Sequence, residues 1–427
     1  MLGVGLALHP EPELLLVARR AIEELADFYE ISPELHWQDP ATPSSARAQL
    51  LDLVRQSGKP SVGHGLFTSL GTPRDAARSD PLRELLAADQ AAFGFAHYSE
   101  HLGWTCQGGV EAVLPLPLPP SEAAAQLVAE NLRGLKELTP RVAFENGAFL
   151  TPLGDPAHEP EFLRRICDLA DCELVLDLHN AYAGCLNANM SLEDWLAGVP
   201  WERVIQIHLS GGSESEPGWL PSGATRRLDS HDAPVPEPVW VAYERALGWA
   251  PRLEGVVLEW LGLREDQAAA HERDLRRARE LWAGRPARAT PPPARPLALR
   301  EHLAPEEVRA TLSEVLHEPD PVSALEVRLA GGSPLARETL GGLDREGLRL
   351  TQLIVKRLRF ERVLQGHSRC REEFHADPAG FTGRFRAYDD AGPSRSPWPS
   401  QEAAAFMGWG GPSPDKSPLL SSLGRRR

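Results

Sequence analysis

Cysteine is scarce in this sequence of 427 residues: five are present, and no two of them form a CxxC pair. Such sparse, unpatterned cysteine is typical of a reducing cytoplasm and argues against a disulfide framework. Long hydrophobic runs are missing too, because no apolar stretch reaches the roughly 18 residues that a membrane span requires. The first residues contain neither the basic segment nor the cleavage site of a secretion signal. These absences predict a cytoplasmic protein that does not associate with a membrane.

An excess of positive charge is also absent. The formal net charge is −15, whereas a nucleic-acid surface needs a basic face, so no nucleic-acid partner is expected. The composition, 42% apolar and 25% charged, is that of a globular protein. The chain is too long for one ordinary core, and its length predicts one large domain followed by a smaller one.

No glycine-rich phosphate loop follows the first apolar run, which disfavours an open doubly wound sheet. Eight apolar runs instead alternate with eight amphipathic segments over about 285 residues, as is usual for a (β/α)8 barrel. The expected strands are Leu2–Leu8, Phe28–Ser32, Ser61–Leu66, Phe95–Glu100, Arg141–Glu145, Glu173–Leu178, Val204–Leu209 and Gly255–Trp260. The expected helices are Pro12–Asp27, Ser45–Gln56, Leu82–Ala92, Glu122–Leu138, Glu161–Asp171, Leu192–Gly198, Val239–Leu247 and Glu265–Trp282.

This alternation stops at Gly284. Residues 284–296, GRPARATPPPARP, are predicted to form an extended proline-rich linker. Helices are expected beyond it over Pro305–Leu316, Glu346–Leu364 and Gln401–Met407. The predicted fold class is therefore α/β, with a (β/α)8 TIM barrel over residues 1–283 and a small, mostly α-helical C-terminal domain over residues 297–410. Residues 411–427 are expected to be a disordered tail.

Side chains that can bind metals end most of the predicted strands. In a (β/α)8 barrel the carboxyl ends of the strands meet at one mouth, where active sites are built. Residues two apart on a strand share a face, so Asp177 and His179 are both expected to point inward. One such side chain alone is more often exposed or hydrogen-bonded than a ligand, but six strand ends together predict a metal or acid–base site. The strand-end residues are His64, His97, His101, Glu145, Asp177, His179, His208 and Glu259, and the loop after the seventh strand adds Asp229 and His231.

These groups outnumber the four ligands of a zinc ion or the three that suffice for a non-haem iron. The surplus predicts two or three metal ions that share bridging carboxylates, for which Glu145, Asp177 and Glu259 are the candidates. Mixed nitrogen and oxygen ligation suits iron, manganese or zinc. No cysteine ends a predicted strand, which leaves a soft position for a substrate sulfur.

The same residues belong to segments that resemble a known family over residues 1–283. GVGLALHPE, HGLFTSLG, YSEHLGW, FENGAF, LVLDLHNAY, IHLSGG, LDSHDAPVPEPVW and LEW occur in the order and spacing of the DUF692 family. Its members are multinuclear non-haem iron-dependent oxidative enzymes. The resemblance implies a TIM barrel with two or three iron ions, mixed Fe(II)/Fe(III), and O2 as co-substrate. It also implies an oxidoreductase of natural product biosynthesis that modifies cysteines of a ribosomally made precursor peptide, with a small helical partner protein.

The matching motifs imply a set of site residues. Glu145, Asp229 and His231 are predicted to act in catalysis. The chain departs from the family at His179-Asn180, where Asn-Asn is usual, so His179 is predicted as a ligand or as a neighbour of the ligands. Asn146 and Asn180 are expected behind the ligands or toward the substrate. The implied metal ligands are His64, His101, Glu145, Asp177, His208, Asp229, His231 and Glu259.

Other functions are compatible with the same residues. Endonuclease-like and sugar-isomerase-like barrels also gather His, Asp and Glu around divalent metals, which activate water or polarise a carbonyl. A non-catalytic scaffold that binds metal only to fold is a third possibility. For residues 297–410, one prediction is a fused module that engages the precursor peptide in place of a separate partner, and the other is a packing or dimerisation domain.

Overall fold

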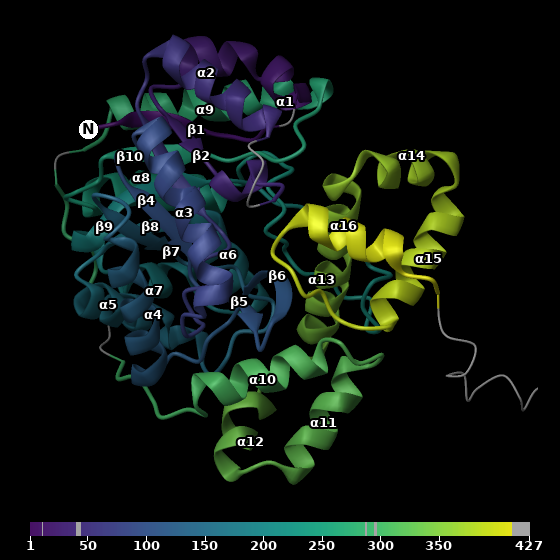
Figure 1. The fold of residues 1–427 in the computed structure, drawn as a ribbon. Helices are drawn as coiled ribbons and strands as arrows, with labels where there is room; N and C mark the ends of the chain where they lie inside the picture. The colour runs from purple at the N-terminus through teal and green to yellow at the C-terminus, as the bar shows by residue number, and fades with distance from the viewer. Residues whose placement is uncertain (11, 40–43, 287, 294–296, 412–427) are drawn as a thin grey trace, which may run out of the picture.

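Eight parallel strands close into a barrel in the computed structural model, which describes residues 1–10, 12–39, 44–286, 288–293 and 297–411 (Figure 1). Their order is β1-β10-β9-β8-β7-β4-β3-β2, and β1 pairs with both β10 and β2. Each strand corresponds to one of the eight predicted runs, so the predicted TIM barrel is confirmed. The strands are β1 Gly3–Leu8, β2 Tyr29–Ile31, β3 Ser61–Gly65, β4 Tyr98–His101, β7 Val142–Glu145, β8 Glu173–Asp177, β9 Val204–Leu209 and β10 Gly255–Leu258.

Amphipathic helices surround the barrel where the sequence predicts them. Ser44 and Ser121 begin two of these helices, and each side chain accepts a hydrogen bond from a backbone N–H of the first turn. The predicted helix over Pro12–Asp27 is divided into α1 and a π-helical turn, η1. These helices are α1 Pro12–Val17, η1 Ala21–Leu25, α2 Ser45–Ser57, α3 Ala76–Phe93, α4 Glu122–Leu135, α5 Glu159–Ala170, α7 Leu192–Ala197, α8 Glu237–Trp249 and α9 Ala268–Ala283, with 3-10 turns η2 Pro33–His36, η3 Pro156–His158, η4 Trp201–Arg203 and η5 Glu265–Gln267.

Besides short 3-10 turns, two strands and one α-helix of the barrel region were not predicted. A hairpin of β5 (Trp104–Gln107) and β6 (Val110–Leu116) is inserted after β4. Gly108 and Gly109 form its turn with φ of 56° and 74°, the left-handed backbone that a tight two-residue hairpin requires and that glycine adopts readily. Helix α6 (Leu178–Asn187) begins directly after β8, because the Asp177 side chain accepts a hydrogen bond from the Asn180 N–H at 2.6 Å.

The C-terminal region is helical, as predicted. One cluster of buried apolar side chains extends from the barrel into it, including Val308, Leu312, Leu325 and Leu348. A separate aromatic cluster around Phe385 holds its last helices together. None of the described helices is both long and apolar enough to cross a membrane. The helices are α10 Pro305–Val315, α11 Pro321–Gly331, α12 Pro334–Gly341, α13 Arg345–Gly366, α14 Ser368–Ala376, α15 Pro378–Asp390 and α16 Pro399–Gly408.

The C-terminal helices contact loops that follow the carboxyl ends of the strands (Figure 1). Such loops surround the mouth of the barrel. The contacts run from the loop after β2 to the loop after β9: Ser400 Oγ donates to Gln38 O at 2.8 Å, Arg362 lies 5.6 Å from the Phe67 ring centre, Arg309 Nη1 donates to Gly71 O at 2.7 Å, and Arg226 pairs with Asp344 at 2.8 Å. The domain boundaries at 283, 296 and 410 stay predictions, and the predicted tail, apart from Gly411, lies outside the described residues.

Glu159, the first residue of α5, gives the fold a pH-dependent stability. Burial raises the pKa of its carboxyl to about 7, although Trp195 Nε1 donates a hydrogen bond to it at 3.2 Å. The protonated form is therefore favoured in the folded state. Its contribution to the free energy of unfolding is fully present below about pH 4.5 and is lost as the pH rises through 7. Since one pKa unit corresponds to about 1.4 kcal/mol and Glu159 is partly exposed, Glu159→Gln should stabilise the protein by about 2 kcal/mol at pH 8.5.

Urea unfolding of the wild type and the variant at pH 5 and pH 8.5 measures this effect. The gain should appear mainly at the higher pH, because the glutamine amide mimics the protonated acid. Glu161→Gln, on the same helix but half-exposed, is the matched control and should change little. An equal effect of Glu159→Gln at both pH values would contradict the assignment.

Candidate metal centre

Six strand-end residues predicted as ligands converge at the mouth of the barrel. They form two groups whose ligand atoms lie within 4.8 Å of one another. The first group is His64, His101 and Glu145, from β3, β4 and β7. The second is Glu145, Asp177, His208 and Glu259, from β7, β8, β9 and the residue after β10. Glu145 belongs to both groups, as a carboxylate that bridges two metal ions would.

The two oxygens of Glu145 face different imidazoles. Oε2 lies 3.1 Å from His101 Nε2 and 3.3 Å from His64 Nε2, whereas Oε1 lies 3.0 Å from His208 Nδ1. Glu145 itself is 1% exposed. A carboxylate whose two oxygens face different groups of ligands can bind one cation through each oxygen.

Each imidazole of these groups is held from behind through its other nitrogen. His64 Nδ1 lies 2.7 Å from Ser99 Oγ, and His101 Nδ1 lies 2.7 Å from the Gly65 carbonyl. His208 Nε2 lies 3.0 Å from Glu30 Oε2. Metal-binding histidines usually have such a partner, which fixes the ring and leaves the near nitrogen for the metal.

A third set of predicted residues lies beside these groups, in the loop after β9 and on α6. His231 Nε2 is 2.6 Å from Asp229 Oδ1, and His179 Nδ1 is 3.5 Å from the same oxygen. His231 Nδ1 lies 3.8 Å from Glu259 Oε2, which connects this set to the second group. His179 does not share a strand with Asp177 as expected, because β8 ends at Asp177 and His179 lies in the first turn of α6; it is nevertheless buried beside Asp229.

His97 and the two predicted asparagines also have definite places. His97 precedes β4, is fully buried, and joins neither ligand group among the described residues. Asn146 and Asn180 contact the predicted ligand Asp177: Asn146 Nδ2 donates to the Asp177 carbonyl at 3.0 Å, and the Asn180 N–H donates to its carboxylate at 2.6 Å. Asn180 Nδ2 also donates to the Asn146 carbonyl at 3.0 Å.

Several ligand atoms are buried without a hydrogen-bond partner. A buried polar atom left in this state costs about 1–3 kcal/mol, so such atoms call for an explanation. Here they are the nitrogens and carboxylate oxygens that face one another across the mouth, a donor set that fits divalent metal ions. The atoms are His64 Nε2, Glu145 Oε2, Asp177 Oδ2, both ring nitrogens of His179, and Glu259 Oε2.

The charges in the cluster shift its pKa values in opposite directions. Burial and the neighbouring carboxylates of Glu145, Asp229 and Glu259 raise the pKa of Asp177 well above its ordinary value. Burial alone would also raise the pKa of Glu259, but His208 and His231 hold it at about 2. The carboxylates raise the pKa of His208 well above its usual range despite burial. The site therefore favours positive charge, which bound metal ions would supply.

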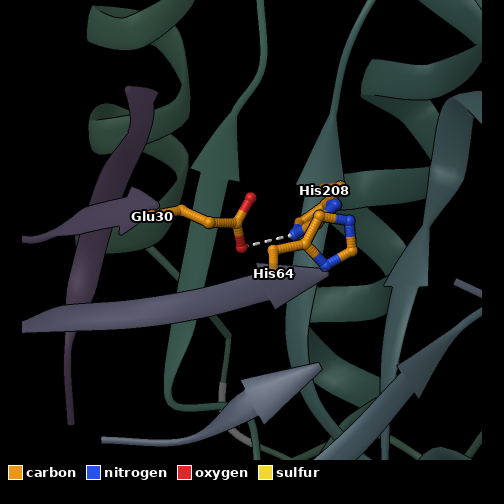
Figure 2. Close-up of side chains that lie close together, drawn as sticks. All are labelled: Glu30, His64 and His208. Atoms are coloured by element: carbon orange, nitrogen blue, oxygen red, sulfur yellow. Dashed lines mark hydrogen bonds and ion pairs between the residues drawn. The ribbon is translucent and has the colours of Figure 1, made fainter. Parts of the chain in front are cut away.

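One contact of this centre was missed in the sequence: Glu30, on β2. Figure 2 shows its carboxylate directed at the ring of His208, with His64 alongside. Glu30, His64 and His208 form a further close group of possible ligands. Burial would raise the pKa of Glu30, but His208 and His64 lower it below its ordinary value. The available signal was a lone carboxylate inside the apolar run FYEIS.

The closed barrel and the clustered His, Glu and Asp side chains at its mouth define a TIM-barrel protein with a candidate multinuclear metal centre. Residues 2–281 match the family described as RiPP precursor modification enzyme MbnB/TglH/ChrH, whose substrates are ribosomally synthesised peptides. The chain belongs to this family, the DUF692 family, and the resemblance seen in the motifs is confirmed.

Curated relatives with the name UPF0276 protein are similar to the same region. The protein of Rhizorhabdus wittichii is 35% identical over 206 residues, which is 48% of this chain and 70% of the relative. The protein of Caulobacter vibrioides is 33% identical over 250 residues, 58% of this chain and 82% of the relative.

Two solved TIM-barrel structures share low sequence identity with this chain. A D-psicose 3-epimerase from Clostridium cellulolyticum H10 is 11% identical with a TM-score of 0.39, covering 66% of this chain and 97% of the epimerase. A xylose isomerase-like TIM barrel protein from Mycobacterium smegmatis is 16% identical with a TM-score of 0.39, covering 64% of this chain and 90% of that protein.

Proposed function

We propose that this protein is a multinuclear iron enzyme that uses O2 to modify cysteine residues of a ribosomally made precursor peptide. Membership of a peptide-modifying family supports the substrate class. The observation that carries the multinuclear part is the shared position of Glu145 between two groups of ligand atoms. Iron, when bound there, supplies one-electron and O2 chemistry, and the protein supplies geometry and charge.

The chain offers three places for metal ions. His64, His101 and Glu145 would hold one ion, and Glu145, Asp177, His208 and Glu259 a second. His179, Asp229 and His231 are proposed for a third. All five cysteines are buried, and none belongs to a ligand group among the described residues. A soft ligand position is thereby left to the sulfur of a substrate cysteine, whose thiolate form binds metals.

The substrate is proposed to enter on the side of Asp229 and His231. Their side chains are 28% and 14% exposed, and that of His101 is 23% exposed, whereas those of His208 and Glu145 are 2% exposed or less. The incoming thiol would therefore meet the His231–Asp229 pair before the buried groups. These two residues and Glu145 are proposed to hold the charge and the proton of the entering thiol.

Residues 297–410 are proposed to recognise the precursor peptide, in the role otherwise filled by a separate small helical partner. Two observations support this role. The region contacts loops around the barrel mouth, and a cavity of about 550 Å³ lies at the junction, lined among others by Thr68, Arg78, Gln107 and Arg309. Ligand sites commonly form at such junctions. A packing or dimerisation domain is the alternative.

Metal analysis of anaerobically purified protein tests the proposal. We expect two or three iron ions per chain by elemental analysis, with Mössbauer and EPR signals of coupled iron. O2 uptake should require a short cysteine-bearing peptide encoded beside the gene and should disappear when its cysteines are changed to serine. Zinc alone, with no O2 uptake under any reductant, would favour a divalent-metal hydrolase or isomerase, or a metal-binding scaffold.

Replacing His231 tests the third position. His231→Ala should remove about one metal ion per chain and lower activity, with little loss of fold, because the residue lies in a loop outside the barrel core. The backbone of His231 is left-handed, with φ of 50°, a conformation that histidine and asparagine adopt more often than alanine, so His231→Ala adds a small backbone strain of its own. Elemental analysis and thermal unfolding measure the two effects separately.

The matched control is His375→Ala, an exposed histidine on α14, which should change neither metal content nor activity. His231→Asn separates strain from ligation, since asparagine tolerates a left-handed backbone better than alanine. Full metal content in both His231 variants would remove the residue from the site.

A further inference from the structure

We infer that Glu30 is a positioning residue of the metal centre, which fixes the orientation and the tautomer of His208. The inference rests on the proposed metal site and adds a residue that lies outside the implied ligand set. Glu30 is 1% exposed on β2, and its carboxylate faces Nε2 of His208 (Figure 2). Glu145 faces the other ring nitrogen, Nδ1.

The two ring nitrogens of His208 have different surroundings. Nδ1 lies 3.0 Å from Glu145 Oε1 and 3.4 Å from Glu259 Oε2, where the ligand groups meet. Nε2 lies 3.0 Å from Glu30 Oε2. A neutral imidazole that binds a metal through one nitrogen carries its proton on the other. Metal binding at Nδ1 therefore requires an N–H at Nε2, and Glu30 is the group placed to accept it.

Gln206 could stabilise the other tautomer of His208, so the charge of Glu30 decides which ring nitrogen carries the proton. Its amide nitrogen lies 2.8 Å from His208 Nε2 and 2.6 Å from Glu30 Oε2. If this amide donated to an unprotonated Nε2, the proton would sit on Nδ1 and block the metal side. A carboxylate next to Nε2 attracts an N–H and repels a lone pair, and it accepts the Gln206 N–H itself. Glu30 thus selects the tautomer that leaves Nδ1 free.

The placement of Glu30 differs from that of a ligand to the two bridged positions. Its carboxylate forms a close group only with His64 and His208, and not with Glu145, Asp177 or Glu259 among the described residues. The other two imidazoles are held by neutral groups, the Ser99 hydroxyl and the Gly65 carbonyl. His208 is held by a carboxylate, and hydrogen bonds to charged groups are roughly twice as strong as those between neutral ones.

The test compares metal binding of the full-length wild type and Glu30→Gln. We expect the affinity for Co(II), measured by competition with a chromophoric chelator, to fall by roughly 10–100-fold, as for other outer partners of metal-bound histidines. The number of ions bound at saturation should be unchanged, and the visible absorption bands of the Co(II) protein should shift. The matched control is Glu34→Gln, a carboxyl 4% exposed that accepts from the Leu66 and Phe67 N–H groups.

The inference is overturned if Glu30→Gln binds Co(II) with the affinity and spectrum of the wild type. It is also overturned if saturation falls by a whole ion, since Glu30 would then be a ligand. Should Glu30→Gln fail to fold, Gln206→Leu is tested in its place. This variant removes the competing amide and should keep the wild-type affinity for Co(II). A large loss of affinity would mean that Gln206, and not Glu30, determines the tautomer of His208. A wild type that binds no metal would instead contradict the proposed function.

Discussion

Replacing Glu145 with alanine is expected to abolish turnover and empty both ligand groups, while the barrel remains folded. Glu145 contributes one oxygen to each group, facing His64 and His101 on one side and His208 on the other. No other side chain belongs to both the His64–His101 group and the Asp177–Glu259 group among the described residues. The loss of affinity should exceed the roughly 10–100-fold cost of losing an outer partner.

The fold should survive this change because the apolar core that holds the barrel together does not depend on Glu145. Glu145 is the first of the charges that raise the pKa of Asp177, so its removal relieves the repulsion between these two carboxylates. It also leaves His64, His101 and His208 without the carboxylate that faces them, and breaking a buried pair costs about 3–5 kcal/mol. We therefore expect the metal-free variant to unfold at a lower temperature than the metal-free wild type, but still cooperatively.

Elemental analysis, turnover and circular dichroism measure the three expected results. Glu173→Gln is the matched control: Glu173 begins β8 at the other end of the barrel and pairs with Arg141 and Arg252. It should keep its metals. A Glu145→Ala protein with full metal content and activity would contradict the bridging role.

The convergence of the ligands could be predicted because it follows from strand geometry alone. His64, Glu145 and His208 each lie in or at the end of an apolar run, and a parallel barrel brings those ends together. This reasoning needs the strand boundaries to within one or two residues and nothing else. At His179 the strand geometry did not hold, since Asp177 caps helix α6 and ends the strand there, although His179 still lies beside Asp229.

Glu30 was missed for a different physical reason. A glutamate inside a strand is ordinarily exposed, and its burial depends on a partner from another strand. That partner is His208, 178 positions away in the chain, a separation that no local pattern encodes. The hairpin of β5 and β6 was missed although its Gly108-Gly109 turn is a recognisable local signal.

The position of the C-terminal helices could not be anticipated, and neither could α11, α12, α14 and α15, but α10, α13 and α16 could. Their apolar faces are visible in the sequence, whereas the surface that they cover depends on the assembled barrel. Val308 and Leu312 of α10 belong to the same buried cluster as barrel residues. A linker composition such as GRPARATPPPARP therefore does not establish that the regions on either side fold independently.

The second large expected effect follows from this shared core. A chain ending at residue 296 is expected to lose most of its stability, although every proposed ligand is retained. Each large apolar side chain contributes about 1.5–3 kcal/mol when fully buried, and the net stability of a domain is only about 5–15 kcal/mol. Exposing the barrel side of the cluster around Leu312 and Leu348 to water can therefore cost most of this net stability. Thermal unfolding and size-exclusion chromatography of the fragment measure the loss.

Supplying residues 297–427 as a second chain should reverse that loss, because the two surfaces remain complementary. The expected product is a one-to-one complex with the metal content of the intact protein. The double variant Arg226→Ala, Glu346→Ala is the control: it removes the contacts to Asp344 and Ser222 without uncovering apolar surface, and exposed pairs contribute only about 0–1 kcal/mol. A 1–296 fragment that is monomeric, as stable as the full chain and unable to bind residues 297–427 would contradict the shared core. In the fragment alone, a loss of peptide binding could result from unfolding as well as from the absence of the C-terminal region. The peptide affinity of the reassembled complex therefore measures what the C-terminal region recognises.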